Sequence, residues 1–154
     1  MRRSQTRFRG GSTFDETEFH IADFEQAEFY GSASFGDVGF HSDALFNGTK
    51  FHGMSLFNGA KFHGYTLFVN SEFYGDAVFS GVEFSDEAQF LAALFHSSLD
   101  FEEVVVSNGG SIDLDGAAVM DPRESILPSG FCAVDESIPG APEGAWIIVG
   151  EERG

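Results

Sequence analysis

The sequence predicts an all-β solenoid of stacked coils, and three observations support this fold class. Phenylalanine recurs every five or six residues over most of the chain. The residue two positions before each of these phenylalanines is almost always small or β-branched, and glycine often follows two positions after it. A five-residue step fits neither the 3.6-residue period of a helix nor the alternation of a long strand. It does fit a coil of short sides that turns a corner after each side.

The phenylalanine repeat defines the predicted core. From Phe29 onward its steps alternate between six and five residues. Because residues two apart in an extended segment face the same way, each side should point one small residue and one phenylalanine inward. We predict a structural ladder of Phe8, Phe14, Phe19, Phe24, Phe29, Phe35, Phe40, Phe46, Phe51, Phe57, Phe62, Phe68, Phe73, Phe79, Phe84, Phe90, Phe95 and Phe101.

The repeat resembles the pentapeptide-repeat family. The matching segments are FNGAKF (57–62), FSGVEF (79–84) and LDGAAV (114–119). The resemblance implies a right-handed parallel β-helix with four sides per coil. The alternating steps give 22 residues per coil, against the family's usual length of about 20. We expect the extra residues at two opposite corners, and a three-sided coil is the alternative.

The chain divides into three predicted parts. Residues 1–7 are a disordered basic leader, because they are polar and carry no periodicity. Residues 8–120 form the β-helix, whose last coil is continued after Phe101 by Val106, Leu114 and Val119. Asp121 and Pro122 then interrupt the repeat, and residues 121–154 form a cap.

The predicted cap is a β-hairpin. Two strand-like segments, 131–135 and 145–150, flank a segment rich in proline and glycine. Because the end of a solenoid exposes unpaired backbone, we expect this hairpin to cover the last coil with Trp146 and Phe131. The resemblance to family members that bind gyrase implies an alternative, in which the C-terminal end joins two copies.

The charge excludes several partners. The formal net charge is −17, and residues 10–101 hold fourteen acidic residues against Lys50 and Lys61. Direct binding to nucleic acid or to an anionic membrane needs positive charge, so we predict neither and expect a protein partner instead. Cys132 is the only cysteine, and no apolar leader or membrane-length apolar run is present. A cytoplasmic location is therefore expected.

Histidine is the one residue type that suggests metal binding. His20, His41, His52, His63 and His96 each follow a ladder phenylalanine directly, so all should point outward. In a four-sided coil His20, His41 and His63 stack on one side, and Tyr30, His52, Tyr74 and His96 on the opposite side. A flat exposed column offers no ligand from a third direction. We therefore predict no metal site, no cofactor and, because no catalytic motif is present, no enzyme.

The remaining candidates for function are surface contacts. We predict contact residues at Leu45 and Leu67 on one side, Leu56 and Val78 on another, and His41 and His63 on a third. The predicted function is that of a non-catalytic, acidic, protein-binding scaffold. The family resemblance implies a DNA mimic that acts on a DNA-binding protein such as a type II topoisomerase. The alternative is a self-assembly module whose copies meet through exposed apolar columns or the C-terminal hairpin, giving a monomer or a homodimer.

Overall fold

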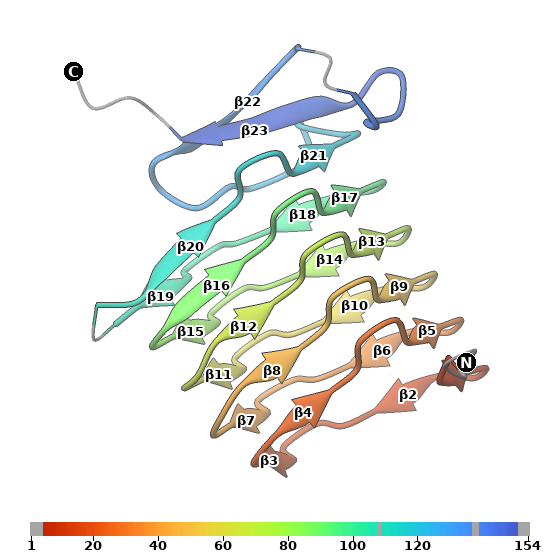
Figure 1. Cartoon of the computed structure of the whole chain (residues 1–154), viewed down its shortest axis with the longest axis vertical. Coiled ribbons are helices and arrows are strands. Elements are labelled where there is room, and N and C mark those ends of the chain that lie inside the picture. The colour runs from red at the N-terminus through yellow and green to blue at the C-terminus, as the bar shows by residue number, and fades with distance from the viewer. Residues whose placement is uncertain (1–4, 108, 137–138, 151–154) are drawn as a thin grey trace.

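The computed structural model describes residues 5–107, 109–136 and 139–150, and within them the chain is a β-solenoid without helices. Strands β1–β20 form five coils of four short strands each, and every strand lies on its equivalent in the neighbouring coil (Figure 1). The predicted all-β parallel solenoid with a C-terminal hairpin is confirmed. The coil has four sheets, so the three-sided alternative is wrong.

The four sheets run the length of the rod. The first contains β1 (Arg7–Phe8), β5 (Glu28–Phe29), β9 (Lys50–Phe51), β13 (Glu72–Phe73), β17 (Leu94–Phe95) and β21 (Ala118–Val119). The second contains β2 (Ser12–Thr13), β6 (Ala33–Ser34), β10 (Ser55–Leu56), β14 (Ala77–Val78) and β18 (Leu99–Asp100). The third contains β3 (Glu18–Phe19), β7 (Gly39–Phe40), β11 (Lys61–Phe62), β15 (Glu83–Phe84) and β19 (Val105–Val106). The fourth contains β4 (Ala22–Asp23), β8 (Ala44–Leu45), β12 (Thr66–Leu67), β16 (Glu87–Gln89) and β20 (Ser111–Asp113).

The register follows the phenylalanine repeat. Phe29 pairs with Phe51, Phe51 with Phe73, and Phe73 with Phe95, which gives 22 residues per coil in the centre of the rod. The coil at each end differs: Phe8 pairs with Phe29, and Phe95 pairs with Val119. The longer last coil arises between Val106 and Ser111, where the chain inserts extra residues before it re-enters the fourth sheet.

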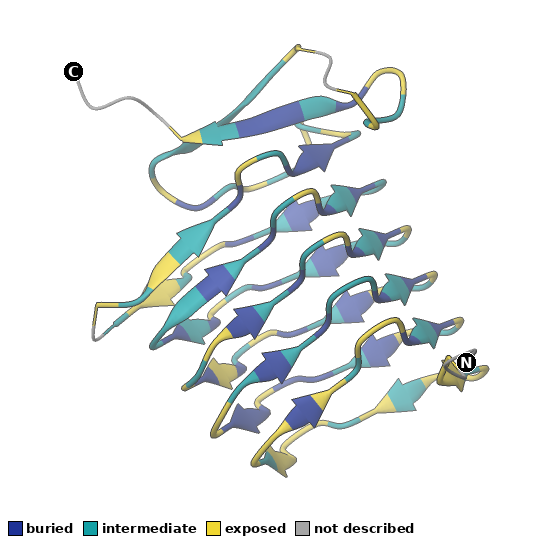
Figure 2. Cartoon of the chain, in the orientation of Figure 1, coloured by how far each residue is buried: buried dark blue, intermediate teal, exposed yellow. Residues whose placement is uncertain are grey.

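The core is a continuous stack of phenylalanine rings. Phe29 and each later ladder phenylalanine is at most 2% exposed, and Figure 2 shows the buried inner positions repeating from coil to coil. Rings in one column stack with centroids as close as 4.6 Å, as in Phe40 and Phe62. Rings of the second and fourth sheets meet edge to face across the centre, as in Phe35 and Phe46 at 5.6 Å. Each buried ring contributes roughly 1.5–3 kcal/mol through the hydrophobic effect.

The two kinds of corner use glycine differently. Within a five-residue step, the residue two positions after the phenylalanine has positive φ, as in Gly59 (71°), but Ala92 (55°) also takes this conformation. Within a six-residue step, the glycine two positions after the phenylalanine is needed because the coils approach closely there. A Cβ on Gly53 would lie 2.7 Å from a backbone carbon of Gly31 in the coil below. Positive φ therefore explains only the first kind of corner.

The C-terminal hairpin closes the first sheet. Strand β22 (Phe131–Val134) pairs antiparallel with β23 (Trp146–Gly150), and β23 pairs antiparallel with β21. Ile148 is fully buried in the main core, against which Phe131 also packs. Ile148 thus occupies the position that was expected for Trp146.

The last coil is less regular than the sequence predicts. Leu114 and Val119 are fully buried, as their register suggests, but Val106 is 44% exposed although it pairs with Phe84. Strand β19 is the last strand of the third sheet, so no further coil covers Val106. At the other end the predicted leader overlaps the fold, because Arg7 belongs to β1. Residues 1–4 of that leader lie outside the described residues.

Candidate protein-binding faces

Each sheet presents one flat face to solvent, and we number faces 1 to 4 after the sheets. Along a strand the ladder residues point inward, so the residues on either side of them form outward columns that rise from coil to coil. Among its described residues, face 4 carries apolar residues and carboxylates but no lysine or arginine. Its outward columns are Ile21–Asp43–Tyr65–Glu87–Ser111, Asp23–Leu45–Leu67–Gln89–Asp113 and Glu25–Asn47–Val69–Leu91–Asp115.

Face 4 combines an apolar centre with acidic ends. Leu45 and Leu67 are direct neighbours in the register, and Val69 and Leu91 lie beside them. The carboxylates lie toward the two ends of the face, with Asp23, Glu25 and Asp43 toward the N-terminal end and Glu87, Asp113 and Asp115 toward the C-terminal end. None of the positions in these columns holds lysine or arginine. The face therefore resembles an interface with an apolar core and a charged rim of one sign.

Face 2 lies on the opposite side and repeats this pattern more weakly. Leu56 pairs with Val78 and Met54 is 43% exposed, so the predicted apolar pair is adjacent. Asp76 lies beside this pair. It accepts hydrogen bonds from Ser97 Oγ (2.5 Å) and from the Ser98 amide (3.3 Å). These hydrogen bonds lower the pKa of the Asp76 carboxyl below its ordinary value, so it stays ionised in weak acid.

Face 3 carries the first histidine column. His41 and His63 stack with ring centroids 5.6 Å apart, and His20 lies 5.8 Å from His41. His41 Nε2 is 2.5 Å from Glu18 Oε2 of the coil below. Among the described residues, no group of three histidine, cysteine, aspartate or glutamate side chains is placed to hold a metal ion. The chemistry available on face 3 is thus hydrogen bonding and ion pairing.

Face 1 carries the second aromatic column. The rings of Tyr30, His52, Tyr74 and His96 are nearly parallel, with centroid distances of 4.8, 5.1 and 4.6 Å. The hydroxyl of Tyr74 donates to Glu72 (2.6 Å), and this hydrogen bond raises the pKa of Tyr74 to about 12.

Tyr30 and Glu28, two coils nearer the N-terminal end of face 1, form the same tyrosine–glutamate hydrogen bond. The hydrogen bond from Tyr30 to Glu28 raises the pKa of Tyr30 and lowers that of Glu28. In this column most ring faces are covered by neighbouring rings. It therefore stabilises the stack rather than leaving a surface for a planar ligand.

The repeat and the four-sheet geometry agree with a family comparison. Residues 57–105 match the family model of pentapeptide repeats (9 copies). This segment of the chain therefore consists of pentapeptide repeats. No curated protein is significantly similar to the chain. Among its described residues, no helix has the length and apolar character needed to cross a membrane.

The acidic charge of the solenoid is banded rather than uniform. Residues 44–71, which include the whole middle coil, contain no aspartate or glutamate but contain Lys50 and Lys61. On face 1 the outward column therefore reads Glu28–Lys50–Glu72, and on face 3 it reads Glu18–Gly39–Lys61–Glu83. Carboxylates surround the rod near both ends, and the middle coil separates the two bands.

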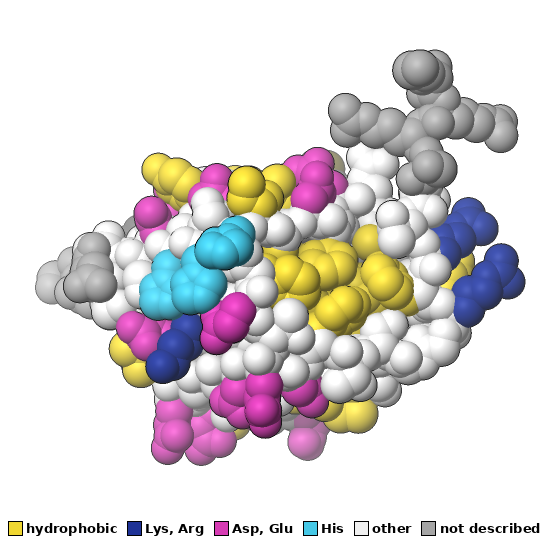
Figure 3. All heavy atoms as spheres, turned by 90° about the horizontal axis from the view of Figure 1, so that it is seen from below, with side chains coloured by type: hydrophobic (Ala, Val, Ile, Leu, Met, Phe, Trp, Pro, Cys, Tyr) yellow, Lys and Arg dark blue, Asp and Glu magenta, His cyan; other side chains and the backbone are white. Residues whose placement is uncertain are grey.

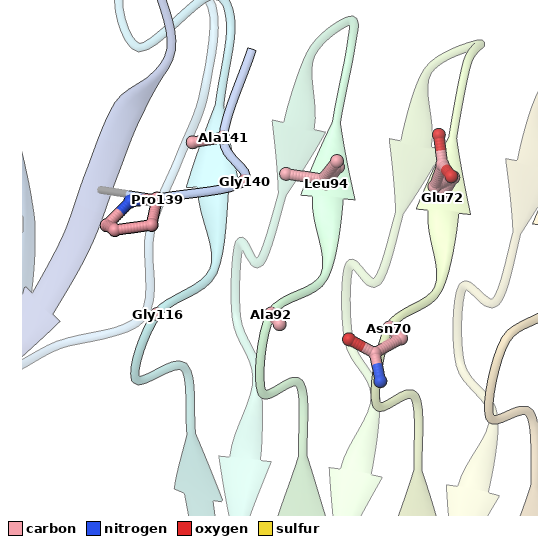
Figure 4. A pocket seen from close by; sticks show the side chains of 8 residues that line it. All are labelled: Asn70, Glu72, Ala92, Leu94, Gly116, Pro139, Gly140 and Ala141. Atoms are coloured by element: carbon pink, nitrogen blue, oxygen red, sulfur yellow. The ribbon is translucent and has the colours of Figure 1, made fainter. Parts of the chain in front are cut away.

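One pocket lies between the rod and the hairpin. The loop at Pro139–Ala141 overhangs faces 1 and 4 beside Leu94 and Ala92, with Glu72 and Asn70 one coil lower (Figure 4). The space measures about 290 Å³ and is half open to solvent. The Glu72 carboxylate already accepts a hydrogen bond from Tyr74. The polar side chains that line the described part of this pocket are Asn70 and Glu72.

The predicted surface residues lie in the columns that the repeat implies, and their role as contact residues stays a prediction. Leu45 and Leu67 lie on face 4, Leu56 and Val78 on face 2, and His41 and His63 on face 3. The sequence also places the apolar Val69 and Leu91 near this centre, and the residues that were missed are the face 4 carboxylates. A tabulation of outward positions by coil, using the 22-residue register, would have found them.

Proposed function

We propose that this pentapeptide-repeat protein is a non-catalytic scaffold that binds a protein partner through face 4. The partner presents an apolar patch with basic residues on both sides of it. The observation that carries this proposal is the apolar centre of face 4, formed by Leu45, Leu67, Val69 and Leu91, with carboxylates above and below it. The cytoplasm is the proposed location.

The apolar centre and the carboxylates of face 4 contribute differently to binding. Apolar side chains at the centre of an interface contribute most when partner atoms exclude water from them. Rim charges add less to affinity, but they speed encounter and fix orientation. Six carboxylates with no nearby cation on face 4 attract basic residues and repel acidic ones. A rigid sheet loses little conformational entropy on binding, which favours a flat partner surface.

The test compares two paired variants that remove similar apolar side chains from opposite faces. Leu45→Ser/Leu67→Ser alters face 4, and Leu56→Ser/Val78→Ser is the matched control on face 2. Each variant and the wild-type protein are immobilised, and proteins captured from native cytoplasm are compared. We expect a set of basic proteins that binds the wild type and the control, is lost with the face 4 variant, and elutes at moderate salt. Equal capture by all three proteins would contradict the proposal.

A finer possibility is DNA mimicry toward a type II topoisomerase. It is supported by the carboxylate bands on faces 2 and 4, which give a narrow rod with strong negative potential near both ends. A supercoiling assay with gyrase tests it directly. Inhibition that disappears in Asp113→Lys/Asp115→Lys would support mimicry. Undisturbed supercoiling at high micromolar protein would argue against it.

The alternative function is a self-assembly module whose copies meet through apolar columns or the C-terminal hairpin. The adjacent pair Leu56 and Val78 on face 2, and the exposed Val105 and Val106 near the hairpin, favour this possibility. Light scattering across a concentration series tests it. Association that is lost in Leu56→Ser/Val78→Ser or in Val105→Lys would identify the surface responsible.

A further inference from the structure

The N-terminal end of the solenoid is open in the described part of the chain. Strands β1, β2, β3 and β4 are the terminal strands of their four sheets. In β2 and just after it, the amides of Ser12 and Phe14 donate to Ser32 and Ser34 of the second coil. Alternate residues of a strand direct their backbone N–H and C=O groups to opposite sides. The backbone groups of Gly11 and Thr13 therefore face away from the rod. Such free edges can pair with another chain.

The same end exposes part of the phenylalanine core. Phe8, Phe14, Phe19 and Phe24 are half-buried, whereas the phenylalanines one coil further in are at most 1% exposed. Figure 3 looks at this end and shows a hydrophobic patch in its middle. Lysine or arginine side chains lie at one edge of the view, and the histidines lie toward the opposite edge with one further basic side chain beside them. An apolar centre surrounded by open strands is the surface that one more coil would cover.

Glycine at one corner supports this interpretation. A Cβ on Gly31 would lie 2.7 Å from the backbone of Gly11, and one on Gly75 would lie 2.5 Å from the Gly53 carbonyl oxygen. These corners are packed backbone against backbone. The equivalent Gly10 in the first coil has no atom within 4 Å of its Cβ position. The packing that later coils make at this corner is thus absent at the end.

We propose that two copies of this chain associate through these N-terminal ends in a two-fold symmetric dimer. A two-fold axis across the rod reverses the direction in which the chain circulates, so each open strand meets a strand of the other copy in antiparallel orientation. Antiparallel pairing already closes the other end, where β23 pairs with β21. Four strand edges and four phenylalanines per copy would be covered at once.

Charge selects the rotation between the two copies. Arg7 and Arg9 lie on face 1, and Glu18 lies on the opposite face 3. A two-fold axis that passes through faces 2 and 4 brings face 1 of each copy over face 3 of the other. Arg7 and Arg9 then oppose Glu18 of the other copy, whose carboxylate also contacts His41 of its own second coil, and this arrangement occurs twice. The interface is isologous, with the same residues on both copies.

The C-terminal hairpin excludes a filament. A head-to-tail stack would need an open C-terminal end on the first sheet, and β23 occupies that edge. Association through the N-terminal ends therefore stops at two copies. One solenoid end is small compared with the roughly 800 Å² per partner of a standard interface. We therefore expect a dimer that dissociates on dilution.

Sedimentation equilibrium of the full chain between about 10 μM and about 1 mM tests the proposal. We expect a reversible monomer–dimer equilibrium, with a dimer that is nearly twice as long as the monomer by small-angle scattering. Arg7→Glu/Arg9→Glu should weaken the dimer about tenfold or more, and Glu18→Arg alone should weaken it too. The triple variant restores opposite charges across the interface and should recover much of the affinity. Recovery would not occur if the single effects came from misfolding.

The matched control is Lys50→Glu/Lys61→Glu, which makes the same charge change in the middle coil. It should dimerise like the wild type. A protein that stays monomeric over the whole range would overturn the proposal. So would a dimer that responds to the middle-coil variant or to Val105→Lys near the C-terminal end but not to the N-terminal variants. These outcomes leave the face 4 proposal intact, because that face contains none of the altered residues.

Discussion

At the C-terminal end an antiparallel hairpin lies on the last coil, whereas at the N-terminal end no described segment lies on the first. The difference is visible in the core: Ile148 fills the C-terminal end and is fully buried, while Phe14 at the N-terminal end is only half-buried. A stack of coils buries side chains only between neighbours. Each end therefore has to be closed by another element or remain a contact surface.

The largest expected effect comes from opening the capped end. Ile148→Asp places a carboxylate in the core, where no basic group lies in the surrounding cluster of apolar residues. We expect a loss of about 5 kcal/mol or more in the free energy of unfolding, because an unpaired buried charge is among the most costly substitutions. Urea unfolding measures the loss, and binding of a hydrophobic dye should report the exposed last coil.

The control for this substitution is Ile126→Asp. Ile126 lies in the segment that leads into the hairpin, but its side chain is 48% exposed. The same chemical change should cost less than about 1 kcal/mol there. A similar loss at both positions would mean that the hairpin does not seal the core.

The second prediction compares one substitution in the middle coil and at the open end. Phe57→Ala removes a fully buried ring that stacks on Phe35 and Phe79, and it should cost about 4 kcal/mol. Phe14→Ala should cost about half as much, since water already reaches that ring. Thermal unfolding of both variants decides the point. Equal costs would indicate that the open end is covered in solution, as the proposed dimer requires at high concentration, so dilute samples should be used.

The third prediction uses glycine as a probe of coil-on-coil contact. Gly75→Ala should cost about 2 kcal/mol, because its Cβ would collide with the backbone of the coil below. Gly10→Ala should be nearly neutral in the monomer, because that position is open. Guanidinium unfolding of the two variants provides the measurement. A large cost at Gly10 in dilute protein would show that another segment already occupies the space beneath it.

The phenylalanine repeat was sufficient to predict the coil, its 22-residue length and the columns on each face, because burial of one ring per side admits a single register. The repeat did not predict which residues are buried at the C-terminal end of the solenoid. Val106 continues the repeat in sequence, yet it remains 44% exposed because the third sheet ends there. Trp146 was expected to cover the last coil, but Ile148 is the residue of β23 that packs into the main core. These outcomes depend on which neighbour a residue meets, and neighbours at the two ends lie outside the repeat.

The smallest expected effect concerns the tyrosine pairs on face 1, of which Tyr30 lies nearer the open end and Tyr74 nearer the capped end. The pKa of Tyr74 is raised from 10.0 to about 12, first because its hydroxyl donates to Glu72. A raised folded-state pKa means that the pair stabilises the protein fully below pH 10, and that this contribution is lost as pH rises toward 12.

Absorbance titration at alkaline pH should find that Tyr74 titrates late, and Tyr74→Phe should remove that transition. Glu72→Gln should lower its pKa, because the substitution removes the carboxylate charge and keeps an acceptor oxygen. The corresponding variant Glu28→Gln near the open end should lower the pKa of Tyr30 and leave that of Tyr74 almost unchanged. If Glu28→Gln moved both tyrosines equally, the two pairs would be coupled through the stacked rings of His52. The two tyrosine–glutamate pairs on face 1 would then not behave independently at the two ends of the rod.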